Sequence, residues 1–347
     1  MKTSNFISGK GIKAMTLFFA LAIVAASCSK QENDITPAEP QDSSMDIATI
    51  LENSEQYPEL FIGQDDMLKS GGNSKYVYKR PPTFYNLTLA LIKTDLLSTV
   101  ARNKLTVLAP SDEAFEKLFR ELGVKGIRDI PAQQLKPILL YHVINGRVFS
   151  NQLKNGFVPT LNGAAVEVKL GNGVMFNDAK VVYADIRALN GVIHVIDKVL
   201  LPPSKNIVEI AAGNPAFSIL VDAVKAAGLA DVLATGGPFT VFAPTNDAFA
   251  ALLAERGLTA AQLLGNKELL TKVLLYHVVD GRVYSSDLPA SPLSVKTLNG
   301  GSFSIDASTL KITDFNGRKS GLIPSLLNIQ ATNGVIHVID RVILPQL

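Results

Sequence analysis

The feature that most constrains the fold of this chain is an internal repeat. The thirteen residues NGVIHVIDKVLLP from Asn190 return as NGVIHVIDRVILP from Asn333, with eleven positions identical. TVLAPSDEAF, LLYHVINGRVFS and TLNG return as TVFAPTNDAF, LLYHVVDGRVYS and TLNG, and the four offsets are 134, 135, 137 and 143 residues. Copies in one order at nearly constant offset indicate two homologous domains of about 140 to 160 residues each.

These repeats divide the 347 residues into segments, and the two copies meet near LPPSKN at residues 201–206. We predict a signal peptide at 1–27, a flexible lipidated tether at 28–42, a first domain at 43–203 and a second domain at 204–347. The first domain carries an insertion at about 62–83 that the second lacks. A hydrophobic share of 47% is ample for two buried cores.

The N-terminus has the pattern of an exported protein. Three lysines precede the apolar stretch AMTLFFALAIVAAS, which is too short to span a bilayer and is typical of a signal peptide. Cys28, the only cysteine, follows directly. AASC resembles a bacterial lipoprotein cleavage site, although Ala25 stands where leucine is usual. We therefore predict lipidation of Cys28 and a position in the cell envelope, at the outer membrane and open to surface display; an incidental cysteine beside an ordinary cleavage site is the alternative.

The charge of the remaining chain excludes one class of partner. Residues 1–27 contain three of the 33 basic residues and none of the 31 acidic ones, so their removal leaves a net charge of about −1. A nearly neutral chain lacks the basic surface that nucleic acid requires. We therefore expect no nucleic-acid binding.

The repeated motifs predict strands and helices in alternation. TVLAP and TVFAP are typical of strands that end at Pro110 and Pro244, and the following Ser111 and Thr245 can cap helices with acidic first turns. Thr259 and Gln262 form a capping-box pattern that opens another helix.

Later motifs add buried strands and turns. NG at Asn145 and DG at Asp280 predict two-residue hairpin turns. The strands around VIHVI are apolar on both alternate faces, which favours cover on both sides, and we place their ends at Pro202 and Pro345. This mixture predicts an α+β fold, in which each domain is a β-sandwich or wedge with several α-helices.

Together these residues resemble the fasciclin domain. The strand-to-helix TVFAPTNDAF, a central YH and a terminal NGVIHVIDxVLLP occur in that order twice, over roughly residues 43–345. The resemblance implies two tandem fasciclin-like domains that serve in extracellular adhesion or matrix association, without enzymatic activity. The first copy departs from the pattern, because its insertion separates the opening helix from NLTLALIKTDLLSTV.

The four histidines are candidates for chemistry. His194 and His337 lie within the last strand of each copy, and no HxH, HExxH or CxxC spacing accompanies any histidine. Asp197 and Asp340 lie three residues farther on and so face the other side of the pleat, and G-x-S-x-G is absent from the sequence. We therefore interpret Pro110, Pro244, His194, His337, Asp197 and Asp340 as structural motif residues, and predict no catalytic residues, no metal and no cofactor.

Two stretches are candidate binding sites. The first is the pair Tyr141 and His142, repeated as Tyr276 and His277. In animal fasciclin proteins the matching region is implicated in integrin adhesion, so the resemblance implies binding; the alternative is that both rings pack at a helix–strand junction. NGR and DGR resemble integrin peptides only superficially, because the predicted hairpins account for them.

The second candidate is the insertion itself. SKYVYKRPPTFY, residues 74–85, holds four aromatic and three basic residues in twelve positions. Tyr76, Tyr78, Arg80 and Tyr85 are therefore candidate anchors for a partner. The alternative is an extra hairpin that covers a sheet edge.

From the sequence we predict a non-enzymatic adhesion or matrix-association module that is anchored to the bacterial envelope. Its expected partners are surface or matrix proteins or glycans, and the membrane through its lipid. The alternative is an accessory lipoprotein that captures glycans for an uptake system, and an enzyme ranks third.

Overall fold

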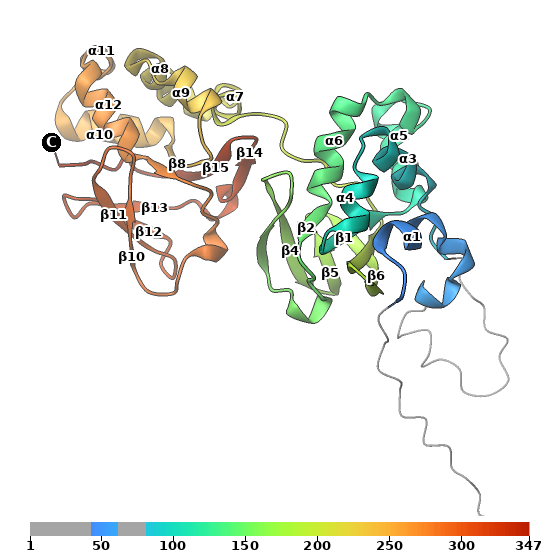
Figure 1. The fold of residues 1–347 in the computed structure, drawn as a ribbon. Coiled ribbons are helices and arrows are strands. Elements are labelled where there is room, and N and C mark those ends of the chain that lie inside the picture. Colours follow the sequence, from blue (N-terminus) through green and yellow to red (C-terminus); the bar gives the residue numbers. More distant parts are fainter. Residues whose placement is uncertain (1–42, 62–80, 347) are drawn as a thin grey trace, which may run out of the picture. The chain divides into compact units, whose positions relative to one another are not determined.

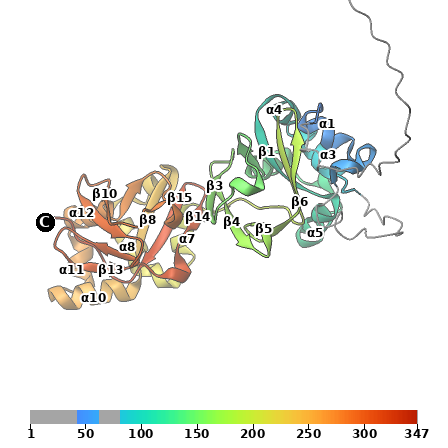
Figure 2. The same cartoon turned by 90° about the horizontal axis from the view of Figure 1, so that it is seen from below.

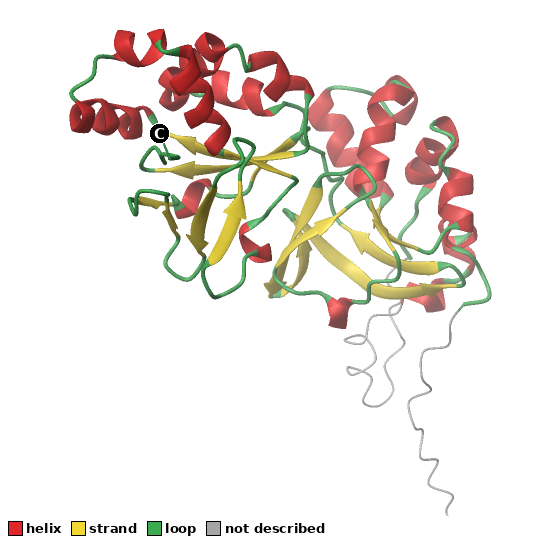
Figure 3. Cartoon of the chain, turned by 60° about the vertical axis from the view of Figure 1, so that its left-hand side comes forward, coloured by secondary structure: helices red, strands yellow, loops and turns green. Residues whose placement is uncertain are grey.

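The computed structural model describes residues 43–61 and 81–346, and in this part of the chain each repeat forms a separate α+β domain. In both domains the helices gather on one side and the strands on the other (Figure 1, Figure 3). The predicted fold class is therefore confirmed. The signal peptide, the tether with Cys28, and Tyr76, Tyr78 and Arg80 lie outside the described residues.

The first domain is built on a single continuous sheet. Its strand order is β2-β1-β7-β6-β5-β4-β3. Figure 2 labels β1, β3, β4, β5 and β6 of this sheet. The strands are β1 Leu105–Pro110, β2 Val143–Asn145, β3 Gly156–Pro159, β4 Ala165–Gly171, β5 Gly173–Phe176, β6 Ala179–Ala188 and β7 Gly191–Ile196. The α-helices are α1 Ile47–Glu52, α3 Tyr85–Lys93, α4 Leu97–Arg102, α5 Asp112–Leu122 and α6 Ala132–Tyr141. The 3-10 helices are η1 Ser54–Gln56, η2 Pro58–Phe61, η3 Ile127–Asp129 and η4 Ser150–Gln152.

The second domain divides the same arrangement into two sheets, ordered β14-β15-β8-β9 and β10-β11-β12-β13. The strands are β8 Phe239–Pro244, β9 Val278–Asp280, β10 Leu293–Lys296, β11 Ser302–Asp306, β12 Lys311–Thr313, β13 Lys319–Gly321, β14 Ile329–Ala331 and β15 Gly334–Ile339. The α-helices are α7 Ile207–Ala212, α8 Ser218–Ala227, α9 Ala230–Thr235, α10 Asn246–Arg256, α11 Ala260–Gly265 and α12 Lys267–Tyr276. The 3-10 helices are η5 Pro215–Phe217, η6 Ser285–Asp287 and η7 Pro324–Leu326.

The difference between the copies lies at β6. In the first domain β6 is one ten-residue strand whose register against β7 shifts twice. In the second domain β13 and β14 stand in its place, with η7 between them. The six additional residues of the second copy before its last motif therefore divide one bent strand into two short ones.

The first strand of each domain pairs with its last strand. β1 lies parallel to β7, and β8 lies parallel to β15. All four strands sit inside their sheets, and β1, β7 and β15 are buried at every position. The continuous apolar runs of the sequence thus correspond to strands covered on both faces, as predicted.

The predicted helix starts are confirmed. Ser111 caps α5 by accepting from the Ala114 amide at 3.4 Å, and Thr245 caps α10 by accepting from the Ala248 amide at 3.3 Å. The helices end at glycines in the left-handed conformation, with φ of 67° and 63°, which an L-residue adopts at a cost. Thr259 and Gln262 form the expected capping box.

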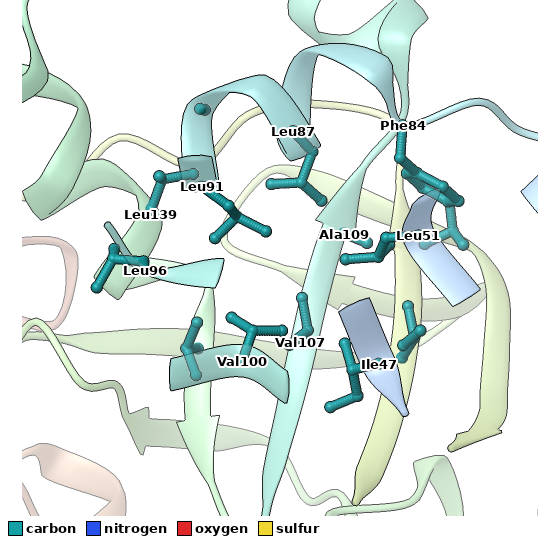
Figure 4. Packing of buried hydrophobic residues seen from close by; sticks show 14 of the residues in the cluster. Ile47, Leu51, Phe84, Leu87, Leu91, Leu96, Val100, Val107, Ala109 and Leu139 are labelled. Carbon is teal, nitrogen blue, oxygen red and sulfur yellow. The ribbon is translucent and has the colours of Figure 1, made fainter. Parts of the chain in front are cut away.

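Each domain has two cores, because alternate residues of the first strand point to opposite faces. Val107 and Ala109 face the helices, where they pack with Leu87 and Leu91 of α3 (Figure 4). Leu108 faces the interior of the wedge formed by the strands. The second domain repeats this arrangement on β8.

The predicted strand ends at Pro202 and Pro345 are wrong. β7 ends at Ile196 and β15 at Ile339. The next residue is an aspartate whose carboxylate takes over the pairing: Asp197 Oδ1 accepts from the Lys180 amide at 2.7 Å, and Asp340 Oδ1 accepts from the Gly321 amide at 2.7 Å. A side-chain acceptor in place of the next backbone carbonyl ends the ladder.

The predicted hairpins at Asn145 and Asp280 are also wrong. β2 and β9 end at these residues, and the chain that follows is irregular and leads into η4 and η6. Thr106 Oγ1 accepts from the Val148 amide at 2.8 Å, and Thr240 Oγ1 accepts from the Val283 amide at 2.9 Å. These hydroxyls hold the chain that follows β2 or β9 against the first strand of its domain.

Candidate functional site

The repeated tyrosines lie inside the wedge rather than on its surface. Tyr141 is the last residue of α6 and Tyr276 the last of α12, and each is 1% exposed. The Tyr141 hydroxyl donates to the Ala165 carbonyl at 2.8 Å, and that of Tyr276 donates to the Ser302 carbonyl at 2.6 Å. Burial raises the pKa of both phenols. In the folded domain these rings join a helix end to β4 or β11 and offer almost no surface to a partner.

The adjacent histidines are also buried, with 1% and 2% of their surface exposed. His142 Nε2 accepts from the Leu200 amide at 2.9 Å, so its Nδ1 carries the proton and donates to the Ile138 carbonyl at 2.8 Å. His277 repeats both bonds, at 3.1 and 2.8 Å. Each ring ties the end of a helix to the segment that follows the last strand.

We expect acid to destabilise both domains through these rings. In an unfolded chain imidazole has a pKa of about 6.5, whereas burial lowers the pKa of His142 and His277 to about 4. The folded state therefore binds fewer protons, so the stability from each neutral ring is complete above the unfolded pKa and is lost as the pH falls toward 4. The expected loss is about 3 kcal/mol per ring.

Urea unfolding at about pH 7.5 and about pH 4.5 measures this loss. The control is His277→Gln, which removes the titrating ring from the second domain and leaves the first unchanged. Over the same pH change, we expect the free energy of unfolding of the second domain to fall by roughly 2–3 kcal/mol less in this variant than in wild type. The same acid sensitivity in variant and wild type would contradict the assignment to His277.

The strand histidines hold the opposite tautomer. His194 Nδ1 accepts from the Asp185 amide at 3.2 Å, so Nε2 donates to the Val148 carbonyl at 2.9 Å. His337 repeats both bonds, at 3.3 and 2.9 Å. Burial lowers the pKa of both rings. They stay neutral at physiological pH and join the last strand to the chain after β2 or β9.

Both nitrogens of all four rings are thus occupied by backbone groups. A metal ligand needs a free ring nitrogen. Within residues 43–61 and 81–346, no three histidine, cysteine, aspartate or glutamate side chains lie close enough together to hold a metal ion. Asp197 and Asp340 bond backbone amides and not the histidines.

The arginines of NGR and DGR donate hydrogen bonds to backbone carbonyls of their own domains. Arg282 Nη1 donates to the Gly334 carbonyl at 2.7 Å and to that of Ala331 at 3.0 Å, while Nη2 donates to Thr332 at 2.7 Å. Arg147 donates in the same way to the β6 carbonyl of Ala188. These guanidinium groups replace the missing hairpin as the link between the chain after β9 or β2 and the turn before the last strand.

The sequence interpretation missed the asparagines that open the thirteen-residue repeat. Asn333 Oδ1 accepts from the Ile207 amide at 3.0 Å, and Nδ2 donates to the Leu233 and Gly236 carbonyls at 2.8 and 2.9 Å. Asn190 makes the same kind of bond to the first amide of α1, at 2.9 Å. Each amide group holds a helix start and a helix end against the last strand. The sequence did carry a signal for this role, because an asparagine opens the thirteen-residue repeat in both copies.

Of the four candidate anchors in and beside the insertion, only Tyr85 lies among the described residues. Tyr85 is the first residue of α3, and it is 62% exposed. Its backbone amide donates to Asp112 Oδ2 at 3.1 Å, which fixes the helix start and leaves the ring at the surface. Tyr85 is therefore available to a partner.

A groove of about 570 Å³ also opens in this domain. Its lining includes Pro81 and Thr83 and the carboxylates of Glu55, Asp112 and Glu113. The Asp112 oxygens accept from amides at the start of α3, so this carboxylate is structural.

No helix in the described part of the chain has the length and apolar character to cross a bilayer.

Comparison with known proteins identifies the repeated domain. The fasciclin domain model matches residues 82–202 and 215–345. The chain is 34% identical over 244 residues to pig (Sus scrofa) transforming growth factor-beta-induced protein ig-h3, covering 69% of this chain and 34% of that protein. Human periostin is 31% identical over 248 residues, covering 70% of this chain and 29% of periostin. The chain thus spans about a third of the length of these two relatives.

Shorter and structural relatives were also found. Protein sll1483 of Synechocystis is 45% identical over 152 residues, covering 44% of this chain and 79% of that protein. A solved structure described as a FAS1 domain pair from the insect cell adhesion molecule fasciclin I covers 75% of this chain and 95% of its own, with 23% identity and a TM-score of 0.37.

Proposed function

This chain belongs to the fasciclin domain family, and on that premise we propose that it is a non-enzymatic adhesion module, anchored by a lipid to a bacterial cell envelope. The observation that carries the proposal is the family match over both copies. The repeated motif residues are occupied in internal hydrogen bonds, so recognition falls to surfaces outside them. Its partners are surface or matrix proteins or glycans.

We place the main binding surface on the first domain. Tyr85 is exposed there at the start of α3, and the sequence places Tyr76, Tyr78 and Arg80 in the insertion just before it. A few aromatic and arginine anchors usually carry most of the energy of an interface. Two domains on one lipid anchor would raise the effective concentration of this surface at its target.

Adhesion of beads coated with the protein tests the proposal. Beads carrying residues 29–347 are offered immobilised matrix proteins and, separately, an array of bacterial and host glycans. Saturable binding to a protein target supports adhesion. Binding confined to glycans would favour the accessory uptake lipoprotein instead, and turnover of any substrate offered would contradict a non-enzymatic module.

Replacement of Tyr76, Tyr78 and Arg80 by alanine in the full chain is expected to weaken binding to that target at least tenfold, because anchor side chains each contribute about 1–3 kcal/mol. The matched control replaces two exposed apolar residues and one basic residue of the second domain, Phe315, Leu326 and Lys319, by alanine. Surface plasmon resonance measures both affinities. Unaltered affinity in the first variant, with its thermal transitions preserved, would show that the insertion serves only its own domain.

A further inference from the structure

A cavity of about 210 Å³ lies between the two sheets of the second domain. Phe242 of β8, Ile305 of β11 and Leu322 form buried parts of its wall. Leu288 and Leu310 are half-buried, and Leu293 of β10 is 40% exposed. The cavity therefore has a buried apolar floor and a leucine rim that reaches the surface.

Two of the polar groups on this wall, those of Thr240 and His337, already have partners. Thr240 Oγ1 donates to the Gly281 carbonyl at 2.8 Å and accepts from the Val283 amide at 2.9 Å. Both nitrogens of His337 are bonded to backbone groups. No aspartate, glutamate, lysine or arginine is among the described residues that line the cavity. A charged ligand would lose its hydration here without gaining a counter-charge, whereas an apolar one would not.

One lining hydroxyl keeps a proton to donate. Ser285 Oγ accepts from Asn328 Nδ2 at 2.7 Å, which uses a lone pair and leaves the hydroxyl hydrogen. An acceptor atom on a ligand can take that hydrogen. The other polar side chains of the lining are those of Thr240, His337 and the exposed Ser294.

The two domains fill this region differently. In the first domain Phe176 of β5 pairs with Val168, and its ring centroid lies 6.2 Å from that of His194. The matching place in the second domain, opposite Ile305, holds the smaller Ile312. There the aromatic ring beside the histidine is Phe242, which comes from the opposite sheet. The aromatic rings between the sheets thus come from different strands in the two domains.

We propose that this cavity binds an uncharged, largely apolar small molecule of about eight to ten non-hydrogen atoms, such as a single ring with a short substituent and one hydrogen-bond acceptor for Ser285. The size follows from volume, since an apolar protein cavity of about 150 Å³ holds benzene and this one has about 210 Å³. This binding is separate from adhesion and uses a different domain.

Ethylbenzene and acetophenone are matched probes, because they share a shape and differ in one carbonyl. Isothermal titration calorimetry on residues 29–347 is expected to show saturable binding of both at one site. Ala307→Phe, which places a ring in the cavity, should weaken both probes at least tenfold, whereas Ala250→Phe on the exposed face of α10 should leave both unchanged. Ser285→Ala should weaken acetophenone several-fold and ethylbenzene little.

Calorimetry checks that each variant is still folded, because the unfolding transition of its second domain must remain. Leu293→Asp provides a test that leaves the buried wall of the cavity unchanged, because it puts a charge at the exposed rim, and it too should weaken both probes. The proposal is overturned if neither probe saturates, or if folded Ala307→Phe or Leu293→Asp binds both as wild type does. Equal loss of both probes in Ser285→Ala would overturn the role given to its hydroxyl.

Discussion

Gly334→Ala is expected to destabilise the second domain by at least about 3 kcal/mol, a large part of the stability of a typical domain. A Cβ at this position would lie 2.1 Å from the Phe239 carbonyl oxygen and 2.6 Å from Ile207 Cδ1. The first contact is with backbone, so it can be relieved only by moving β15 away from β8. That movement breaks the parallel pairing at the centre of the domain.

Differential scanning calorimetry measures this effect, because the first domain serves as an internal reference. Gly191→Ala should lower the melting temperature of the first domain in the same way, since its Cβ would lie 1.9 Å from the Leu105 carbonyl oxygen. Gly265→Ala, where a Cβ meets nothing within 4 Å, is the matched control and should change little or stabilise slightly. If the second domain of Gly334→Ala melts within about a degree of the wild-type domain, the close approach of β15 to β8 at this glycine is contradicted.

Cys28→Ala is expected to remove all fatty-acid label and to move the protein from the membrane fraction to the soluble fraction. The physical reason is that two or more acyl chains give stable attachment, whereas the tether that follows the cysteine is polar. Metabolic labelling with a fatty-acid analogue, followed by fractionation, measures both results. Ser29→Ala is the control and should keep label and location. Membrane attachment of an unlabelled wild-type protein would end the lipoprotein proposal.

Local physical chemistry made much of the fold predictable from sequence. Proline after a β-branched run, followed by Ser111 or Thr245, predicts a strand that turns into a capped helix, and the structure confirms both caps. Apolar residues on both alternate faces of VIHVI predict a strand buried on both faces. These signals act within a few residues, so they can be read from a single sequence.

Long-range bonds explain what could not be predicted. The hairpin patterns at Asn145 and Asp280 fail in a segment that is held from afar, because Thr106 and Thr240, about forty residues earlier in the chain, accept from the Val148 and Val283 amides. The tautomers of the histidines depend on backbone amides from other elements. For the binding surface, the sequence indicated candidate side chains, and the structure shows that Tyr141 and Tyr276 are enclosed while Tyr85 is exposed.

The parallel pairing of β1 with β7, and of β8 with β15, also fixes when each domain can fold. The parallel partner of each first strand is the last strand the ribosome makes, so until synthesis of that copy is almost complete the first strand has only β2 or β9 to pair with. Closing so long a segment is slow compared with local helix formation. The sheet that contains the first strand is therefore completed late in each copy, in two steps, one per domain. Such a chain is suited to threading through a narrow export channel, because the completed sheet appears only after most of each copy has passed.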